Sequence, residues 1–202
     1  MSTDTGHAEP GREPVAGLGT HRSSRRIDVF LKPGDYFVGD ASHRIRTLLG
    51  SCVSVTLWSS PPRIGAMSHF LLATRNGLKR NMEDVRGLDL KRLDARYGDE
   101  ALRLMLHELA RRNVEPSQCS AKIFGGGNMF PMQSVSGAVA IGRRNGEAAR
   151  SLLQDYGIEV VSESLFGDGH RQIAFDIDTG DVWARRVALG HPARRVQKGD
   201  VT

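Results

Sequence analysis

The chain has 202 residues, 39% of them hydrophobic, which is enough for one domain with a packed core. Its net charge of +5 comes from 28 Lys and Arg against 23 Asp and Glu, with much of the excess near the two ends, so no nucleic-acid-binding surface is predicted. No run approaches the roughly 18 apolar residues of a membrane span, so no membrane insertion is predicted. Two cysteines and no apolar leader favour a reducing, cytoplasmic compartment.

The two ends of the chain differ in composition from its middle. Residues 1–26 are rich in Gly, Pro, Ser, Thr and charge, so they bury too little apolar surface to offset the entropy of ordering. Residues 188–202 are rich in Gly, Pro, Arg and Lys. We therefore predict a disordered N-terminal tail, a single domain over residues 27–187 and a flexible basic C-terminal tail.

The domain is predicted to begin with β-strands. Short apolar or alternating runs indicate strands at residues 27–30, 36–38 and 43–49. An alternating run at residues 53–58 and an apolar run at 64–72 then form a predicted hairpin, with two prolines between them that cannot donate to a sheet ladder.

The register of this hairpin decides whether Cys52 and His69 meet. If the chain folds back about Pro61, Cys52 lies opposite Phe70, and His69 falls on the other face of the sheet. A shift of one residue, through a bulge or an even-length loop, sets Cys52 directly against His69 with Cβ atoms about 5 Å apart. We predict the shifted register, because it forms a thiolate–imidazolium pair suited to nucleophilic catalysis.

Gly50 and Ser51 support a catalytic interpretation of Cys52. A glycine before the thiol allows a tight turn and leaves backbone N–H groups free to face an oxyanion. A cysteine of this kind is also commonly a small core hydrophobe, and a strand histidine is commonly a satisfied core residue, so the residues alone leave both readings open. No cluster of Cys and His has the spacing of a zinc site, and no metal is predicted.

The second half of the domain is predicted to mix helices and strands. Residues 73–96 are polar and predict a loop that folds over the site, and apolar residues at helical spacing predict a helix over 99–112. A strand at 121–124 runs into three glycines whose spacing does not match a phosphate-binding loop. A second helix is predicted over 146–156 with Asn145 as its N-cap. A triad-like role of Asn145 in orienting the histidine is the alternative, without direct support from the sequence. Further strands are predicted at residues 158–162, 172–176 and 182–187.

This order of elements predicts an α+β fold. Its mixed or antiparallel β-sheets pack face to face, and helices flank them.

Several short motifs occur in order along the chain. They are LLGSCVSV at 48–55, GAMSHFLL at 65–72, AKIFGGGNMF at 121–130, IGRRN at 141–145 and GDGHRQIAFDIDTGDV at 167–182. In this order they resemble the chemoreceptor glutamine deamidases, the CheD family, over about residues 28–186.

The resemblance implies a fold similar to that of the cytotoxic necrotizing factor-type cysteine hydrolases. It implies that Cys52 and His69 are catalytic and that Thr47 assists by orienting the histidine or contacting substrate. Gly125 and Gly126 are implied to lie near the cysteine and to let the backbone approach substrate. A strand threonine and an ordinary tight turn also explain these last three residues.

The resemblance also implies an activity and partners. The activity is deamidation of specific glutamines in the cytoplasmic domain of methyl-accepting chemoreceptors, with release of ammonia and without a cofactor. A receptor methylesterase side activity and binding of a CheC-type phosphatase of the chemotaxis system are further expectations.

Two other classes of function compete with this interpretation. One is a non-catalytic regulatory module that binds chemoreceptors or a CheC-type phosphatase, although such a module has no need of both Cys52 and His69. The other is a generic cysteine peptidase, which is disfavoured because here the thiol enters a strand rather than a helix.

Overall fold

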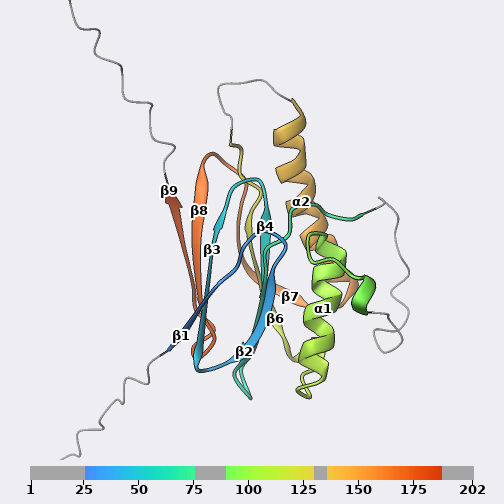
Figure 1. The fold of residues 1–202 in the computed structure, drawn as a ribbon, viewed down its shortest axis with the longest axis vertical. Coiled ribbons are helices and arrows are strands. Elements are labelled where there is room, and N and C mark those ends of the chain that lie inside the picture. The colour runs from blue at the N-terminus through green and yellow to red at the C-terminus, as the bar shows by residue number, and fades with distance from the viewer. Residues whose placement is uncertain (1–25, 76–89, 130–135, 188–202) are drawn as a thin grey trace, which may run out of the picture.

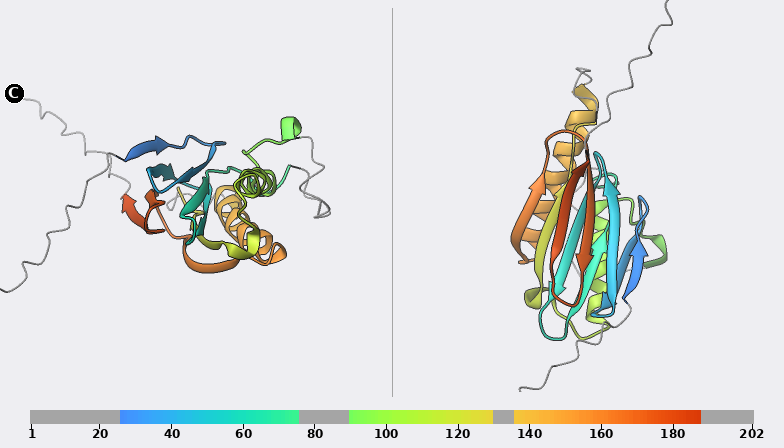
Figure 2. Two further views of the ribbon diagram at one scale, coloured as in Figure 1. Left: turned by 90° about the horizontal axis from the view of Figure 1, so that it is seen from below. Right: turned by 90° about the vertical axis from the view of Figure 1, so that its left-hand side faces the viewer.

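Two β-sheets packed face to face and two helices on one side of them form the fold (Figure 1). The computed structural model describes residues 26–75, 90–129 and 136–187. The three layers, sheet, sheet and helices, are also seen from below in Figure 2. The predicted α+β class with packed sheets is confirmed.

The outer sheet has four strands in the order β1-β3-β8-β9. Their bounds are β1 Ile27–Phe30, β3 His43–Leu49, β8 His170–Asp176 and β9 Val182–Val187. β1 and β3 are parallel, whereas the β3–β8 and β8–β9 pairs are antiparallel. The second view of Figure 2 shows that no helix covers the outward face of this sheet within the described part of the chain.

The inner sheet has five strands in the order β2-β5-β4-β6-β7. Their bounds are β2 Tyr36–Asp40, β5 Ile64–Ser68, β4 Val53–Ser59, β6 Ser120–Gly125 and β7 Glu159–Leu165. Only the β6–β7 pair is parallel among these described strands. This sheet lies between the outer sheet and the helices, so both of its faces are buried over much of its area (Figure 1).

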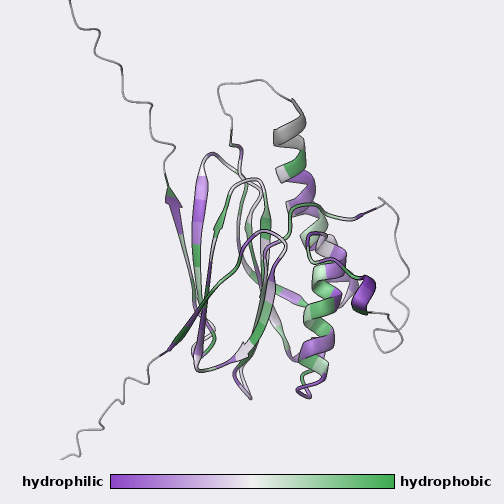
Figure 3. Ribbon diagram, viewed as in Figure 1, coloured by the Kyte–Doolittle hydropathy of each residue, from purple (hydrophilic) through white to green (hydrophobic). Residues whose placement is uncertain are grey.

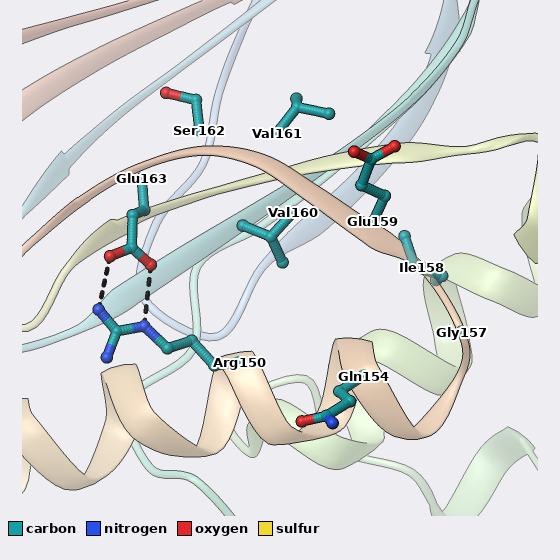
Figure 4. Close-up of a pocket in the computed structure, with 9 residues that line it drawn as sticks. All are labelled: Arg150, Gln154, Gly157, Ile158, Glu159, Val160, Val161, Ser162 and Glu163. Carbon is teal, nitrogen blue, oxygen red and sulfur yellow. Dashed lines mark hydrogen bonds and ion pairs between the residues drawn. The ribbon is translucent and has the colours of Figure 1, made fainter.

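The helices cover the inner sheet. α1 (Gly98–Ala110) packs on β2 and β5, and α2 (Ser136–Asp155) packs on β4, β6 and β7. Two short 3-10 helices, η1 (Leu90–Arg92) and η2 (Pro116–Gln118), flank α1 in the sequence. On α2, Arg150 donates two hydrogen bonds of 2.8 and 2.5 Å to Glu163 of β7, which ties the helix to the edge strand (Figure 4).

The alternation of side chains along the strands produces two hydrophobic cores. One fills the space between the sheets and is formed by Leu31, Ile45, Leu49, Met67, Phe124, Ile173, Phe175 and Ile177. The other lies between the inner sheet and the helices and includes residues of β4, β6, α1 and α2. Figure 3 shows apolar segments on the strands and along α1.

The start of α2 differs from the sequence-based expectation. The helix begins at Ser136, not at residue 146, so Asn145 lies in its middle and is not an N-cap. Gly142 lies within the helix and allows the helix to pass close to Gly126. A Cβ at Gly142 would lie 2.7 Å from the carbonyl oxygen of Gly126. The predicted loop over residues 73–96 lies mostly outside the described residues.

No helix among the described residues is both long enough and apolar enough to cross a membrane.

Candidate active site

Cys52 lies where the chain crosses from one sheet to the other. β3 ends at Leu49 in the outer sheet and β4 begins at Val53 in the inner sheet, so Gly50, Ser51 and Cys52 form the connection. The Cys52 side chain is partly buried and packs against the core between the sheets. A connection this short, between two packed sheets, holds the backbone of the thiol on both sides.

The hairpin register differs from the predicted one. Val53 pairs with Phe70, and the same register runs through the β4–β5 ladder. This register places Cys52 opposite Leu71 and not opposite His69. The predicted direct pairing of Cys52 with His69 is therefore wrong, although the loop between the strands does have an even length of four residues.

Cys52 and His69 nevertheless share one face of the inner sheet. They flank the Val53–Phe70 pair on opposite sides and so occupy diagonal positions, which typically have Cα atoms about 7–8 Å apart. Cys52 packs against the core between the sheets, and so does Met67, two residues before His69. The thiol and the imidazole therefore both face into the space between the sheets.

Thr47 holds the imidazole of His69 from the opposite sheet. Its Oγ1 lies 2.7 Å from Nδ1 of His69 and 2.9 Å from the carbonyl oxygen of Leu31. The carbonyl can only accept, so the hydroxyl donates to Leu31 and accepts a hydrogen bond from Nδ1–H of His69. This arrangement fixes the tautomer of the neutral imidazole and leaves the lone pair on Nε2.

Nε2 of His69 is the free base of the site. His69 is 2% exposed, and Nε2 has no hydrogen-bond partner among the described residues, the Cys52 thiol included. Hydrogen bonds of a catalytic pair are often long in the free protein and tighten when substrate binds. A buried lone pair without a donor also favours binding of any proton donor that reaches it.

Burial sets the protonation of this pair in the free protein. It raises the pKa of the Cys52 thiol above its usual 9.0, partly opposed by the backbone N–H of Cys52 itself. Burial also lowers the pKa of His69 below 6.5, partly opposed by the Leu31 carbonyl and the Asp35 carboxylate. The thiol and the imidazole are therefore both neutral near pH 7. Burial thus acts against the expected resting thiolate–imidazolium pair, and the sequence does not show how deeply both groups are buried.

The glycine-rich loop after β6 packs directly on the Cys52 connection. The N–H of Gly126 donates to the Cys52 carbonyl (2.8 Å), and the N–H of Gly127 donates to the Gly50 carbonyl (2.9 Å). At Gly125, with φ +114°, a Cβ would lie 2.2 Å from the carbonyl oxygen of Cys52. The loop thus reaches the backbone of the thiol residue because it has no side chain there.

Arg171 is a buried residue of this region that the sequence analysis missed. It is 1% exposed, and its guanidinium donates to the carbonyls of Gly125 (3.3 Å from Nη1) and Phe166. It thereby ties the glycine-rich loop to the turn after β7. A signal was available, because Ile173 and Phe175 mark the inward face of β8 and Arg171 continues that alternation.

Asn145 also lies against the site. Its Nδ2 donates to the carbonyls of Leu71 (2.7 Å) and Ser51 (3.4 Å), which follow His69 and precede Cys52. The side chain therefore contacts the backbone on both sides of the Cys52–His69 pair.

Among the residues that the structure describes, no group of three His, Cys, Asp or Glu side chains is placed to hold a metal ion.

We predict that iodoacetamide labels Cys52 before Cys119 in the folded protein. Cys119 is 6% exposed and burial raises its pKa to about 11, whereas Cys52 is partly exposed. Only the thiolate reacts, so both the exposure and the pKa favour Cys52. Peptide mass spectrometry after brief labelling near pH 8 measures the order, and denatured protein, in which both thiols react, is the control. Earlier labelling of Cys119 would reverse the assignment.

Comparison with known proteins identifies relatives of this chain. The family model of CheD chemotactic sensory transduction matches residues 83–186, more than half of the chain. A probable chemoreceptor glutamine deamidase CheD 2 of Albidiferax ferrireducens is 58% identical over 166 residues, which cover 82% of this chain and 91% of that protein. A stretch this long in a chain of 202 residues necessarily includes Cys52 and His69.

More distant relatives carry the same description. A probable chemoreceptor glutamine deamidase CheD 1 of Chromobacterium violaceum is 37% identical over 78% of this chain and 77% of its own length. A probable chemoreceptor glutamine deamidase CheD 3 of Dechloromonas aromatica is 40% identical over 77% of this chain and 85% of its own length. With the match to the family model and the extent of these alignments, the chain belongs to the CheD family.

Proposed function

We propose that this protein deamidates specific glutamines of bacterial chemoreceptors, converting them to glutamate with release of ammonia. The observation that carries the proposal is the Thr47–His69 hydrogen bond, which leaves a free base, Nε2, on the same face as the Cys52 thiol. The relatives described as chemoreceptor glutamine deamidases support the substrate class.

Cys52 attacks the side-chain carboxamide of the substrate. A bond forms between Sγ and the carboxamide carbon while the thiol proton passes to Nε2 of His69. Transfer of the thiol proton to His69 during the attack suits a thiol and an imidazole that are both neutral at rest. His69 then returns this proton to the amide nitrogen, the C–N bond breaks and ammonia leaves a thioester on Cys52.

Water completes the reaction by the reverse sequence. Nε2 of His69 accepts a proton as the water oxygen bonds to the thioester carbon. The C–S bond then breaks, the thiol regains its proton and the product is a glutamate side chain. No metal or organic cofactor takes part in these steps.

Backbone groups around Cys52 are the proposed oxyanion and substrate contacts. The N–H of Cys52, in the connection formed with Gly50 and Ser51, faces its own thiol and can receive the developing oxyanion. Gly125 and Gly126 bring a second stretch of bare backbone against the same residue, where a substrate chain can approach. We propose both groups as parts of the site.

Mass spectrometry of a purified receptor cytoplasmic fragment tests the function. After incubation with the wild-type protein, specific glutamines should carry the mass of glutamate. A wild type that leaves receptors of its own organism intact, with and without a CheC-type phosphatase, would favour a non-catalytic binding module. The same assay on a fragment methylated at glutamates tests the proposed methylesterase side activity, because a thiolate attacks an ester more readily than an amide.

Some finer features belong to the same proposal. The active protein is proposed to be cytoplasmic, to bind a CheC-type phosphatase, and to use residues 27–187 as its catalytic domain, with the segments on either side as tails. Its sandwich, with the thiol directly before the central strand β4 and the histidine directly after the neighbouring strand β5, supports a fold similar to the cytotoxic necrotizing factor type.

Thr47→Val should lower kcat by about 10²-fold with little change in KM. Valine has a similar shape but cannot accept from Nδ1–H, so the imidazole loses the contact that keeps the proton off Nε2. Thr47→Ser retains the hydroxyl and should recover most of the rate. Steady-state kinetics of receptor deamidation measures both variants. Full activity of Thr47→Val would show that the threonine is only a strand residue.

The pH dependence of deamidation should reflect a His69 base that is neutral at rest. Burial lowers the pKa of His69, so the base becomes protonated only below its ordinary pKa of 6.5, and kcat/KM should decline only below pH 6.5. Protonation of His69 also disfavours the folded state, so stability contributed by the neutral imidazole is lost as pH falls below 6.5. A rate profile whose acid limb lies above pH 6.5 would contradict this assignment.

A further inference from the structure

The side chain of Asn145 bridges two backbone carbonyls, one directly before Cys52 and one two residues after His69. Its Nδ2 lies 2.7 Å from the carbonyl oxygen of Leu71 and 3.4 Å from that of Ser51. Asn145 is 1% exposed, so bulk water does not compete for these contacts. Both amide hydrogens have a backbone acceptor, and the side chain is fixed in one orientation.

The bridge lies where the two strands of the site separate. Val53 and Phe70 exchange backbone hydrogen bonds of 3.1 and 3.0 Å at this end of the hairpin. Beyond them, the N–H of Leu71 donates to the carbonyl of Arg96 (2.9 Å) and no longer faces β4. The amide of Asn145 therefore connects the two chains where their backbone pairing has stopped.

The Ser51 carbonyl also controls the direction of the Cys52 N–H. Both groups belong to one planar trans peptide, so they point in opposite directions. Holding the carbonyl toward α2 aims the N–H away from the helix. That N–H already faces the Cys52 thiol, where it opposes the effect of burial on the thiol pKa. An N–H beside the sulfur is also close to the carbon that the sulfur attacks.

We infer that Asn145 is a positioning residue that aims the Cys52 N–H at the thiolate and the oxyanion and holds His69 beside the thiol. The inference rests on the proposed deamidation. Asn145 itself contacts no reacting atom and acts through the peptide between Ser51 and Cys52. A side chain that only stabilised the fold would leave the chemistry of Cys52 unchanged when replaced.

Asn145→Leu tests the inference with little change in shape or charge. Without the bridge, the N–H no longer supports the thiolate, so the midpoint of Cys52 alkylation should move to higher pH and the rate near pH 8 should fall about 10-fold. The titratable and charged groups around the Cys52 connection, His69, His170 and Arg171, are the same in this variant. On the receptor fragment, kcat should fall about 10²-fold with KM unchanged.

Two further variants complete the design. Gln154→Leu also replaces a side-chain amide with leucine, but at an exposed position of α2 (Figure 4), and it should behave as wild type in both assays. Asn145→Gln keeps the amide but displaces it by one methylene, so its losses should be smaller than those of Asn145→Leu.

Each outcome decides the question. A normal alkylation profile and a normal kcat in folded Asn145→Leu would overturn the inference, whatever its melting temperature. If Asn145→Leu does not fold, shown by rapid labelling of Cys119, the folded Asn145→Gln variant carries the test, and a wild-type profile in it overturns the inference. If the wild type proves inert on receptors, the proposed function fails, and the alkylation profile alone decides the role of Asn145.

Discussion

Replacing Cys52 or His69 with alanine should each lower receptor deamidation by at least about 10³-fold, and the double variant should be hardly slower than Cys52→Ala. The two residues act as a unit, because Nε2 serves only to move the proton between the thiol, the leaving ammonia and the attacking water. Once the sulfur is absent, the imidazole has no thioester to form or break. Single-turnover kinetics with the receptor fragment measures all three variants.

Matched controls separate this loss from general effects on the fold. Cys119→Ala removes the buried thiol of the residue that follows η2, and His107→Ala removes a partly exposed histidine of α1. Both should retain most of the activity. Cys52→Ala should still bind the receptor fragment, because binding depends on many surface contacts and not on one sulfur atom.

Other outcomes would change the assignment. Activity that survives Cys52→Ala would place the nucleophile elsewhere in the chain. If the fold-losses in rate of the two single variants multiply in the double variant, Cys52 and His69 act in separate steps. A receptor fragment that remains unmodified with every variant and with the wild type would favour a binding module.

The strands and their faces could be predicted from the sequence because side-chain alternation is a local property. The predicted strands at residues 27–30, 43–49 and 182–187 have the same bounds in the structure. The hairpin register was beyond this kind of reasoning. It depends on the turn after β4, where Arg63 has φ +61° and its N–H donates to the Ser59 carbonyl (3.0 Å). A non-glycine residue in this conformation has no reliable sequence signal.

The contacts of Asn145 could not be predicted from the sequence because they depend on tertiary packing. The helix was predicted to begin at residue 146, but Gly142 allows α2 to pass close to Gly126, and the helix already begins at Ser136. The helix then carries Asn145 to the ends of two strands distant in sequence. The effect of burial on the pKa values of Cys52 and His69 could not be predicted for a related reason, since burial by two sheets is a property of the whole fold.

Gly125→Ala should destabilise the protein by about 3 kcal/mol or more and lower the rate of deamidation about 10²-fold. The alanine would adopt φ +114°, and its Cβ would lie 2.2 Å from the carbonyl oxygen of Cys52 and 3.1 Å from Cα of Val53. Neither atom belongs to a flexible side chain, so the backbone of the thiol residue itself must move. Urea denaturation measures the free energy of unfolding, and receptor mass spectrometry measures the rate.

Gly157→Ala separates the backbone strain in Gly125→Ala from the collision with Cys52. Gly157 also has positive φ, +65°, but nothing lies within 4 Å of the Cβ that alanine would add. This variant should lose only about 1–2 kcal/mol, the cost of a left-handed residue, and keep its activity. The excess loss in Gly125→Ala then reports the displacement of Cys52, and it should appear in kcat as well as in stability. Equal losses in the two variants, with normal activity in both, would mean that the glycine-rich loop can move without disturbing the thiol.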